Sequence, residues 1–226
     1  MKIARVYPIV EDARWCQRLL PTGVQWVQLR VKERPIEAVR AEIRAARALC
    51  LAAGAELVVN DYWQLAIEEG CSWVHLGQGD LAGADIAALR RAQLRLGIST
   101  HDDEELERAL RIDPNYIALG PIYPTLLKQM PWAPQGLARL SEWKRRIGAI
   151  PLVAIGGLTL ERLAGVYAAG ADCAAVVTDI VRHAHPEQRL GAWLDESTRL
   201  ARAASSGGAR GAAREADDAR VARSGQ

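Results

Sequence analysis

The sequence predicts a single (β/α)8 barrel, a closed ring of parallel strands in which a helix follows each strand. Short apolar segments of strand length alternate with longer amphipathic segments, and about eight such units fit into the first 200 residues or so. The main alternative is an open, doubly wound sheet, which usually has fewer units and a glycine-rich turn after its first strand. Here the end of the first expected strand reads Tyr-Pro-Ile at positions 7–9 and contains no glycine, which favours the barrel.

Each expected strand is a short apolar run that ends at a polar or glycine-containing turn. The expected strands span residues 3–10, 24–31, 56–60, 73–77, 94–99, 116–122, 151–155 and 173–178. Expected helices between them include residues 36–53, 81–92, 102–110 and 160–169. Thr100 and Asp103 have capping-box spacing for the third of these helices, and Thr159 is the predicted N-cap of the fourth.

The barrel is expected to occupy residues 1–200 as one catalytic domain, followed by a disordered tail over residues 201–226. After Ala201 the composition shifts to Ala, Ser, Gly, Arg and Asp, and Val221 is the only large aliphatic residue. Such a segment buries too little apolar surface to offset the entropy lost when a chain becomes ordered.

The bulk composition excludes several classes of protein. The chain has 226 residues, half of them hydrophobic, and a formal net charge of +2, so no global electrostatic attraction to nucleic acid is expected. It has no apolar stretch of membrane-spanning length and no signal-peptide pattern at its start. Its four cysteines form no Cys-x-x-Cys pair. We therefore expect a cytoplasmic protein without nucleic-acid or membrane partners; the sequence leaves open whether it forms a homo-oligomer.

The segment 27–32, Val-Gln-Leu-Arg-Val-Lys, is the most informative run in the chain. Side chains of a strand alternate between its two faces, so Gln28, Arg30 and Lys32 share one face and the apolar residues between them share the other. Burying an unpaired charge costs several kcal/mol. The cationic face therefore indicates a cavity that holds an anion, and the alternative is a solvated face of an edge strand.

Two carboxylates follow neighbouring expected strands. Asp61 follows the third strand and Asp80 follows the fourth, and the carboxyl ends of barrel strands form one mouth. Oxygen ligands without His or Cys suit Mg²⁺, which proteins usually hold with one or two carboxylates and substrate phosphates. The alternative is structural: Asp61 would cap the next helix and Asp80 would close a turn.

Three cations accompany these carboxylates. Arg30, Lys32 and Lys128 together with Mg²⁺ would match the charge of a diphosphate, which arginine grips through two oxygens and lysine attracts as a point charge. Lys128 lies in a proline-rich stretch, 124–134, that we expect to form a long loop over the mouth. A solvated loop lysine is the alternative for Lys128.

A second anion site is expected across the mouth. Gly156 and Gly157 follow the seventh strand, and Val177 and Thr178 end the eighth; loops at these positions in barrels commonly bind phosphate through backbone N–H groups. A tight turn is the alternative for the glycine pair. No pair of a nucleophile and a base stands out, and His75 and His101 are expected to be structural. The mouth therefore suits a reaction in which diphosphate leaves and needs no enzyme nucleophile.

The chain resembles the thiamine-phosphate synthase family from about residue 7 to about residue 180. The resemblance rests on seven motifs that occur in order at strand ends, and it implies a (β/α)8 barrel. These motifs are QLRVK at 28–32, VNDY at 59–62, VHLGQGD at 74–80, GISTH at 97–101, GPIYPT at 120–125, APQG at 133–136 and AIGG at 154–157. The family joins a hydroxymethylpyrimidine diphosphate to a thiazole phosphate and releases diphosphate with the help of Mg²⁺.

The resemblance also implies roles for individual residues. Asp61 and Asp80 would bind Mg²⁺, and Arg30, Lys32, Lys128 and Ser99 would be catalytic. The pyrimidine diphosphate would be held by Gln28, Arg30, Lys32, Asn60, Ser99 and Lys128. The thiazole phosphate would be held by Thr125, Gly157, Val177 and Thr178. Further substrate-binding positions would be Leu29, Val31, Leu126 and Leu127.

The implied mechanism is dissociative, and one departure from the family's pattern bears on it. Diphosphate would leave first, and the thiazole nitrogen would then capture the methylene carbon. The family usually has a threonine just before the loop lysine, where this chain has Leu127. A lost hydrogen bond to a charged group costs about 1.5–3 kcal/mol. We therefore expect an active enzyme with weaker thiazole-phosphate binding, which Leu127→Thr would restore.

Two alternatives stay open from the sequence. A thiazole tautomerase shares the barrel and the monophosphate site, but it does not need the diphosphate-binding residues. A catalytically silent protein that binds thiamine precursors would show binding without turnover. The sequence also leaves open whether the thiazole substrate carries a carboxylate.

Overall fold

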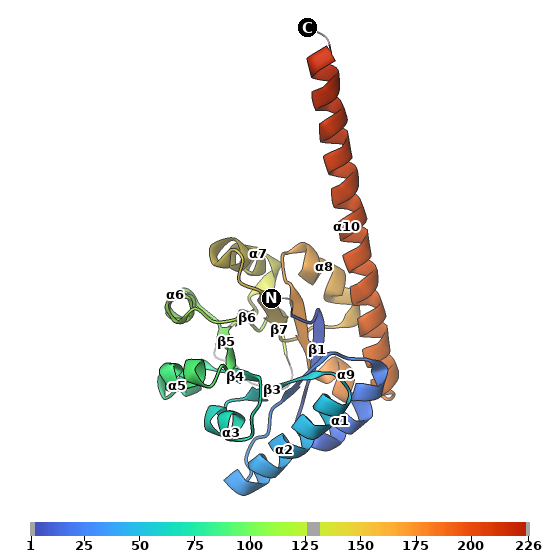
Figure 1. Ribbon diagram of the computed structural model, residues 1–226. Coiled ribbons are helices and arrows are strands. Elements are labelled where there is room, and N and C mark those ends of the chain that lie inside the picture. The colour runs from blue at the N-terminus through green and yellow to red at the C-terminus, as the bar shows by residue number, and fades with distance from the viewer. Residues whose placement is uncertain (1–2, 126–131, 225–226) are drawn as a thin grey trace.

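The computed structural model describes residues 3–125 and 132–224, and its strands form a closed barrel with parallel neighbours in sequence order (Figure 1). This confirms the predicted (β/α)8 fold. The last strand pairs with the first, because Val6–Pro8 lies in register with Ala174–Val176. The strands are β1 (Val6–Val10), β2 (Trp26–Leu29), β3 (Glu56–Asn60), β4 (Trp73–Leu76), β5 (Arg95–Thr100), β6 (Tyr116–Leu119), β7 (Leu152–Ile155) and β8 (Cys173–Val176).

Helices surround the barrel and cover the outer face of its strands (Figure 1). The α-helices are α1 (Ala13–Leu19), α2 (Ile36–Ala52), α3 (Trp63–Glu68), α4 (Gln78–Ala82), α5 (Ile86–Arg91), α6 (Asp103–Ile112), α7 (Gly136–Ile147), α8 (Leu163–Ala168), α9 (Thr178–Val181) and α10 (Pro186–Ser224). Two 3-10 helices, η1 (Leu20–Thr22) and η2 (Leu160–Arg162), precede β2 and α8. The single helix expected at 81–92 is two, because α4 ends at Gly83 and Asp85 caps α5 by accepting from the Ala88 N–H at 2.9 Å.

The side chains of β2 alternate between the helix layer and the barrel interior, as the sequence predicts. Val27 and Leu29 belong to the apolar layer between the strands and the helices, as does Val31 just after the strand. Trp26 belongs to the cluster inside the barrel. Gln28, which is 2% exposed, lies two residues further along the same face. The prediction of a longer strand is wrong, because β2 ends at Leu29.

Four aromatic rings fill much of the barrel interior. The ring centroids of Trp26 and Trp73 are 4.4 Å apart, those of Trp73 and Tyr116 are 5.9 Å apart, and those of Tyr7 and Trp26 are 6.2 Å apart. All four side chains are at most 5% exposed. Gly97 in β5 makes room for this layer, because a Cβ atom there would lie 2.0 Å from Cζ of Tyr116. The barrel is therefore a packed core that opens only at its ends.

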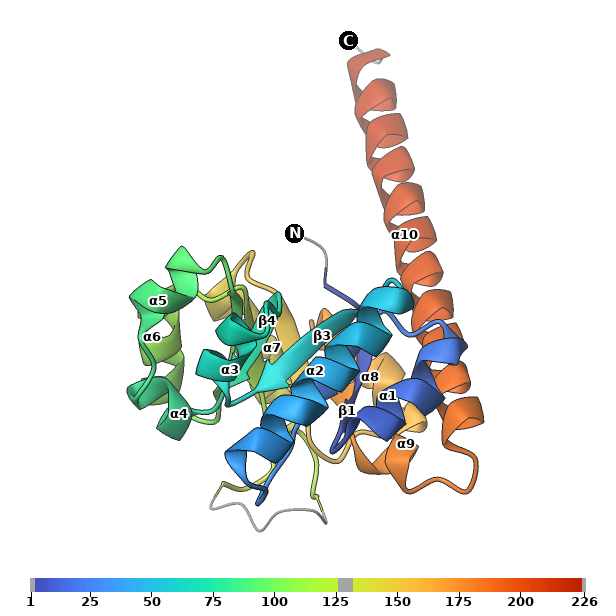
Figure 2. The ribbon, with the colours of Figure 1, turned by 60° about the horizontal axis from the view of Figure 1, so that its bottom comes forward.

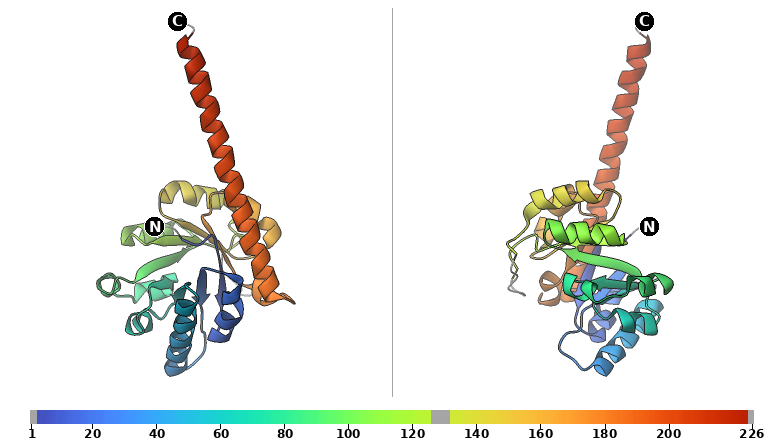
Figure 3. Two further views of the ribbon diagram at one scale, coloured as in Figure 1. Left: turned by 45° about the vertical axis from the view of Figure 1, so that its right-hand side comes forward. Right: turned by 90° about the vertical axis from the view of Figure 1, so that its left-hand side faces the viewer.

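The C-terminal segment belongs to the long helix α10. Helix α10 continues over residues 201–224, and the disordered tail expected over 201–226 stays a prediction. Ala, Arg and Glu are strong helix formers, and a helix satisfies its own backbone hydrogen bonds without a core. Hydroxyl groups also bond to the preceding turn, as when Ser205 donates to the Ala201 carbonyl at 3.1 Å. Figures 2 and 3 show α10 extending away from the barrel, past the end where the N-terminus lies.

Among the described residues, no helix is both long enough and apolar enough to cross a membrane.

Candidate active site

The carboxyl ends of the strands bring most of the predicted site residues to one mouth of the barrel. Arg30 and Lys32 follow β2, and Asp61 follows β3. Asp80 lies in α4 just after β4, and Ser99 is the penultimate residue of β5. The segments that follow β6, β7 and β8 contain Thr125, Gly157, Val177 and Thr178. Leu126, Leu127 and Lys128 lie outside the described residues.

A lysine and two aspartates form the charged centre of this mouth. Lys32 Nζ forms an ion pair with Asp61 Oδ2. The Asp80 carboxyl group lies beside Asp61, and its pKa is raised, first by partial burial and then by the charge of Asp61. Two carboxylates this close repel each other unless a cation lies with them. The structure thus places the three residues together, as the sequence predicts, and gives them a chemistry that favours bound cations.

The backbone of Asp61 is held in a sparsely populated conformation. Its φ angle is 68°, in the left-handed region that Asp and Asn adopt more readily than most residues. Its N–H donates to the carbonyl of His75 on the neighbouring strand at 2.9 Å, and its own carbonyl accepts from Trp63 N–H at 2.7 Å. These bonds fix the direction of a carboxylate that the turn would otherwise leave free. Non-glycine residues in such conformations cluster at functional sites.

The side chains of Arg30 and Gln28 have different surroundings. Arg30 is anchored by its backbone, since its N–H donates to the Val10 carbonyl at 2.8 Å. Its guanidinium is exposed and makes no ion pair with any described residue, so it is free to bind an anion. Gln28 is buried and its side chain hydrogen bonds to Tyr116. The structure therefore leaves the Arg30 side chain exposed after β2 and packs Gln28 against the interior aromatic layer.

Ser99 is coupled to a buried histidine. The Nε2 atom of His75 lies 2.8 Å from Ser99 Oγ, and its Nδ1 atom lies 2.8 Å from the hydroxyl of Tyr116. Burial lowers the pKa of His75 to about 4, so the ring is neutral at physiological pH. The carbonyl of Ser99 also accepts from Gln78 Nε2 at 2.7 Å. His75 is thus a satisfied structural histidine, as expected, but one that contacts a predicted site residue.

The other side of the mouth is built from close backbone contacts. Gly156 and Gly157 have φ angles of 94° and 64°, and a Cβ atom on Gly157 would lie 2.5 Å from the Pro124 carbonyl oxygen. Only glycine fits here, because the loops after β6 and β7 approach each other through their backbones. Val177 and Thr178 follow the adjacent strand β8. The residues predicted for a second anion site therefore lie on neighbouring loops.

His101 lies near this mouth, but among the described residues it makes no hydrogen bond to Ser99. Its Nδ1 atom is 2.7 Å from Glu105 Oε2, and its ring stacks on Trp132 with centroids 3.9 Å apart. The carbonyl of His101 accepts from Gln135 Nε2 at 2.9 Å. These contacts join the start of α6 to the segment just before α7, which agrees with the expected structural role.

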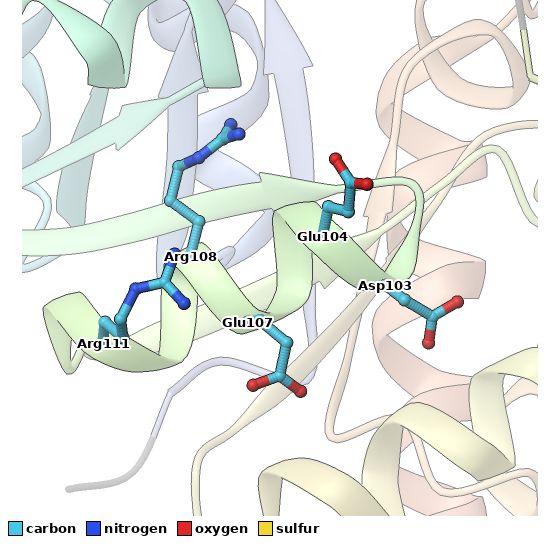
Figure 4. Close-up of a pocket in the computed structure, with 5 residues that line it drawn as sticks. All are labelled: Asp103, Glu104, Glu107, Arg108 and Arg111. Atoms are coloured by element: carbon cyan, nitrogen blue, oxygen red, sulfur yellow. The ribbon is translucent and has the colours of Figure 1, made fainter.

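A hollow on the outer surface of α6 is a poor candidate for a site. Figure 4 shows its lining residues, with the acidic groups toward the first turns of the helix and the two arginines toward the last. Asp103 is paired with Arg139 and Arg146, and Glu107 with Arg146 at 2.7 Å. The acidic groups are therefore part of a surface ion-pair network that links α6 to α7, and the hollow lies outside the mouth.

Known proteins resemble this chain in sequence and in fold. The profile of the family described as thiamine monophosphate synthase matches residues 6–180. The chain is 58% identical to the thiamine-phosphate synthase of Rhizobium etli over 194 residues, which cover 86% of this chain and 95% of that protein. It is 49% identical to the thiamine-phosphate synthase of Salmonella typhimurium over 79% of this chain and 85% of that protein.

The chain belongs to the thiamine monophosphate synthase family. A solved structure agrees in fold: thiamine phosphate pyrophosphorylase from Pyrococcus furiosus superposes with a TM-score of 0.77 at 23% identity, over 87% of this chain and 96% of that chain. A 3-hexulose-6-phosphate synthase superposes with a TM-score of 0.62 at 14% identity, over 85% of this chain and 99% of that chain, which shows the shared barrel alone.

The metal that the family resemblance implies can be tested against the residues present. Among the side chains that the structure describes, no group of three or more His, Cys, Asp or Glu is arranged to hold a metal ion. Asp61 and Asp80 supply two neighbouring carboxylates, and Lys32 is the cation that pairs with Asp61. Mg²⁺ is commonly held by one or two carboxylates together with substrate phosphates and water. The pair therefore fits Mg²⁺ bound jointly with a phosphate substrate.

The hydrogen bonds beneath the mouth were not predicted from the sequence. The rings of His75 and Tyr116 stack with centroids 5.6 Å apart, the Tyr116 hydroxyl bonds to Nδ1 of His75, and Nε2 of His75 bonds to Ser99. The signal was present in β4, where Trp73 and His75 share a face by period-two alternation. A buried polar residue on the same face as core aromatics needs a partner inside the barrel.

Proposed function

We propose that the chain is a thiamine-phosphate synthase, a transferase that joins 4-amino-2-methyl-5-hydroxymethylpyrimidine diphosphate to thiazole phosphate or its carboxylated form. The products would be thiamine phosphate and diphosphate, and the enzyme would act in the cytoplasm. The observation that carries the proposal is the cluster of Lys32, Asp61 and Asp80 at the mouth of the barrel, in a chain 58% identical to a curated synthase.

The diphosphate would be bound between β2, β3 and β4. Arg30 would grip two phosphate oxygens, and Lys32 would turn from Asp61 to the anion, since a metal would take its place on that carboxylate. Asp61 and Asp80 would hold Mg²⁺, which when bound neutralises charge on the departing diphosphate. Lys128, by the family resemblance, would add a further positive charge from the segment outside the described residues.

The bond changes need no nucleophile from the protein. The C–O bond between the methylene carbon and the diphosphate would break, and the thiazole nitrogen would form a C–N bond to that carbon. The role of the chain is to stabilise the leaving group and to hold the two substrates in reacting positions. Asn60, which is 6% exposed, and Ser99 would orient the pyrimidine from the ends of β3 and β5.

The thiazole phosphate would be bound across the mouth. The backbone N–H groups near Gly157, Val177 and Thr178 would face the monophosphate, and the positive φ angles of the glycine pair let an anion approach closely. Thr125 lies on the neighbouring loop. Leu127, in the place of a threonine in the family pattern, would weaken this half of the site.

The two alternative functions are less well supported. A thiazole tautomerase has no use for the diphosphate-binding residues proposed here, Arg30, Lys32, Asp61 and Asp80. A silent binding protein would have no need of paired carboxylates placed for a metal. Curated relatives from Rhizobium etli, Serratia proteamaculans and Salmonella typhimurium, at 49–58% identity, are named thiamine-phosphate synthases.

A reaction mixture with both substrates and Mg²⁺, followed by mass spectrometry, tests the proposal. The expected result is thiamine phosphate that forms only when both substrates are present. Conversion of the thiazole phosphate alone to an isomer would indicate the tautomerase. Binding of both substrates without any product would indicate the silent binding protein and would overturn the synthase.

A further inference from the structure

The buried polar groups beneath the mouth form one continuous chain of hydrogen bonds. The hydroxyl of Tyr7 has Tyr116 as its partner, Tyr116 bonds to Nδ1 of His75 at 2.8 Å, and Nε2 of His75 bonds to Ser99 Oγ at 2.8 Å. The side chain of Gln28 also bonds to Tyr116. Among these hydrogen-bonded residues Ser99 is the one that is partly exposed, so it connects the barrel interior to the mouth.

Such a chain can carry its protons in two directions. In the first, Tyr7 donates to Tyr116, Tyr116 donates to His75 Nδ1, and His75 donates from Nε2 to Ser99. In the second, every bond is reversed, so Ser99 donates to Nε2, Nδ1 donates to Tyr116, and Tyr116 donates to Tyr7. A neutral imidazole has one donor and one acceptor nitrogen, so the tautomer of His75 decides between the two.

Burial favours the first direction. In the second, the proton of the Tyr7 hydroxyl would be left over inside an apolar cluster formed by residues such as Ile9, Val153 and Ala175. Among the described residues, Tyr116 is the hydrogen-bond partner that the structure gives Tyr7. A buried donor without an acceptor is costly, whereas a free proton on Ser99 faces the mouth, where water or a ligand accepts it.

Gln28 supports the same direction. Its hydrogen bond acts to lower the pKa of Tyr116, which is the effect of a donor to the Tyr116 oxygen, and this leaves the proton of Tyr116 to point at His75. Neither ring nitrogen of His75 contacts a carboxylate, so nothing in the hydrogen-bond chain holds a second ring proton. The backbone of Ser99 is fixed independently by Gln78 Nε2 at 2.7 Å.

We propose that His75 is a positioning residue whose Nε2–H occupies a lone pair of Ser99 and thereby aims the Ser99 hydroxyl proton into the mouth. Ser99 then acts as a hydrogen-bond donor to an acceptor atom of the pyrimidine diphosphate, either an anionic phosphate oxygen or a ring nitrogen. This inference rests on the proposed function for the identity of that substrate. It gives Gln28, Tyr7 and Tyr116 a shared role in orienting one catalytic hydroxyl.

Two variants of His75 separate positioning from simple packing. In His75→Gln the amide nitrogen can reach the place of Nε2 and donate to Ser99, whereas in His75→Asn the shorter amide reaches only the place of Nδ1. We expect His75→Asn to lower kcat/KM for the pyrimidine diphosphate about 10- to 100-fold, the usual effect of losing a hydrogen bond to a charged group. His75→Gln should recover most of this loss, and the KM for thiazole phosphate should change in neither variant.

A double-variant comparison tests whether His75 acts through Ser99. If it does, His75→Asn should cost little more once Ser99→Ala is present, because the hydroxyl it aims is gone. Losses that multiply, or equal losses in the Asn and Gln variants, would show that His75 only fills space and would overturn the inference. Melting temperatures of all variants identify any loss that comes from unfolding.

Nitrogen-15 NMR of the histidine rings reads the tautomer without any turnover. The inference predicts a hydrogen bound to Nε2 of His75 and an unprotonated Nδ1. The signals of His75 are those that disappear in the spectrum of His75→Gln. In Tyr116→Phe, which removes the donor to Nδ1, the Nε2–H tautomer should lose population. A hydrogen on Nδ1 in the unaltered protein would contradict the inference. An inactive protein would instead contradict the proposed function, so the two failures are distinguishable.

Discussion

Asp61 combines a charge with an unusual backbone conformation, and the two can be separated by substitution. Asn tolerates the left-handed region as well as Asp does, so Asp61→Asn should fold normally and lose only the charge. We expect it to need about 10- to 100-fold more Mg²⁺ for half-maximal turnover. A Mg²⁺ titration of the initial rate measures this.

A matched control exists for that substitution. Asp113 also has a positive φ angle, 56°, but it ends α6 far from the carboxyl ends of the strands. Asp113→Asn should leave the Mg²⁺ requirement unchanged. An equal shift in both variants would mean that Asp61 acts through its backbone and is not a metal ligand.

His75 makes the stability of the fold depend on pH. Its pKa is about 4 in the folded protein because the ring is buried, and about 6.5 in the unfolded chain. The unfolded state therefore takes up a proton first as the pH falls, so stability is fully present above pH 6.5 and is lost between pH 6.5 and 4. Between pH 7 and pH 5 the loss from this group is about 2 kcal/mol. Asp61 and His101 are the neighbouring titratable groups that have smaller effects on the pKa of His75.

Urea unfolding at the two pH values, without metal, checks this expectation. The unaltered protein should lose about 2 kcal/mol more than His75→Gln, which carries no titrating ring at that position. If the two proteins lose the same free energy of unfolding, then His75 is accessible to protons in the folded state.

At the scale of elements, β5 and β6 fit together because Gly97 has no side chain. A Cβ atom would lie 2.0 Å from Cζ of Tyr116, so Gly97→Ala must displace the ring that bonds to His75. We expect a loss of about 1–3 kcal/mol in the free energy of unfolding, together with lower activity. Gly191 in α10 has nothing within 4 Å of such an atom, so Gly191→Ala should stabilise slightly. Denaturant unfolding of both variants compares them.

The elements also show what could be predicted from the sequence. Eight strands were placed within a few residues, because apolar runs of strand length are distinct from amphipathic helices. The alternation at 27–32 predicted which side chains face the helices, but it did not predict where β2 ends, since Arg30 and Lys32 continue the same pattern beyond the strand. Pairing with neighbouring strands sets that end, and no single segment contains this information.

The predicted cap of α6 was wrong for a related reason. Thr100 is the last residue of β5; its hydroxyl donates to the Ala118 carbonyl at 2.9 Å and accepts from Trp143 Nε1 at 2.9 Å. Asp102 caps the helix instead by accepting from Glu105 N–H at 2.9 Å. The hydrogen bonds of Thr100, like those of His75, join residues on different strands and helices, which local spacing cannot reveal.

At the scale of the whole molecule, the first part of α10 secures this helix to the barrel. Leu190 and Trp193 are fully buried, and Trp193 Nε1 donates to Asp179 at 2.7 Å. Residues 202–206 are exposed. We expect a chain that ends at Ser206 to keep its stability and its activity. Trp193→Ala should instead cost about 3–5 kcal/mol.

Thermal unfolding of the shortened chain and of Trp193→Ala, each beside the full chain, measures these effects. A large destabilisation on removal of residues 207–226 would show that the end of α10 contacts the barrel or a second copy of the chain.

The mouth as a whole predicts one reaction, in which a diphosphate leaves as a new C–N bond forms. Phosphorus-31 NMR of the full-length protein with both substrates and Mg²⁺ follows every phosphate in that reaction at once. The signals of the pyrimidine diphosphate and the thiazole phosphate should disappear together, and inorganic diphosphate and thiamine phosphate should appear in equal amounts. Unchanged substrate signals, or diphosphate released while the thiazole phosphate stays intact, would contradict the account.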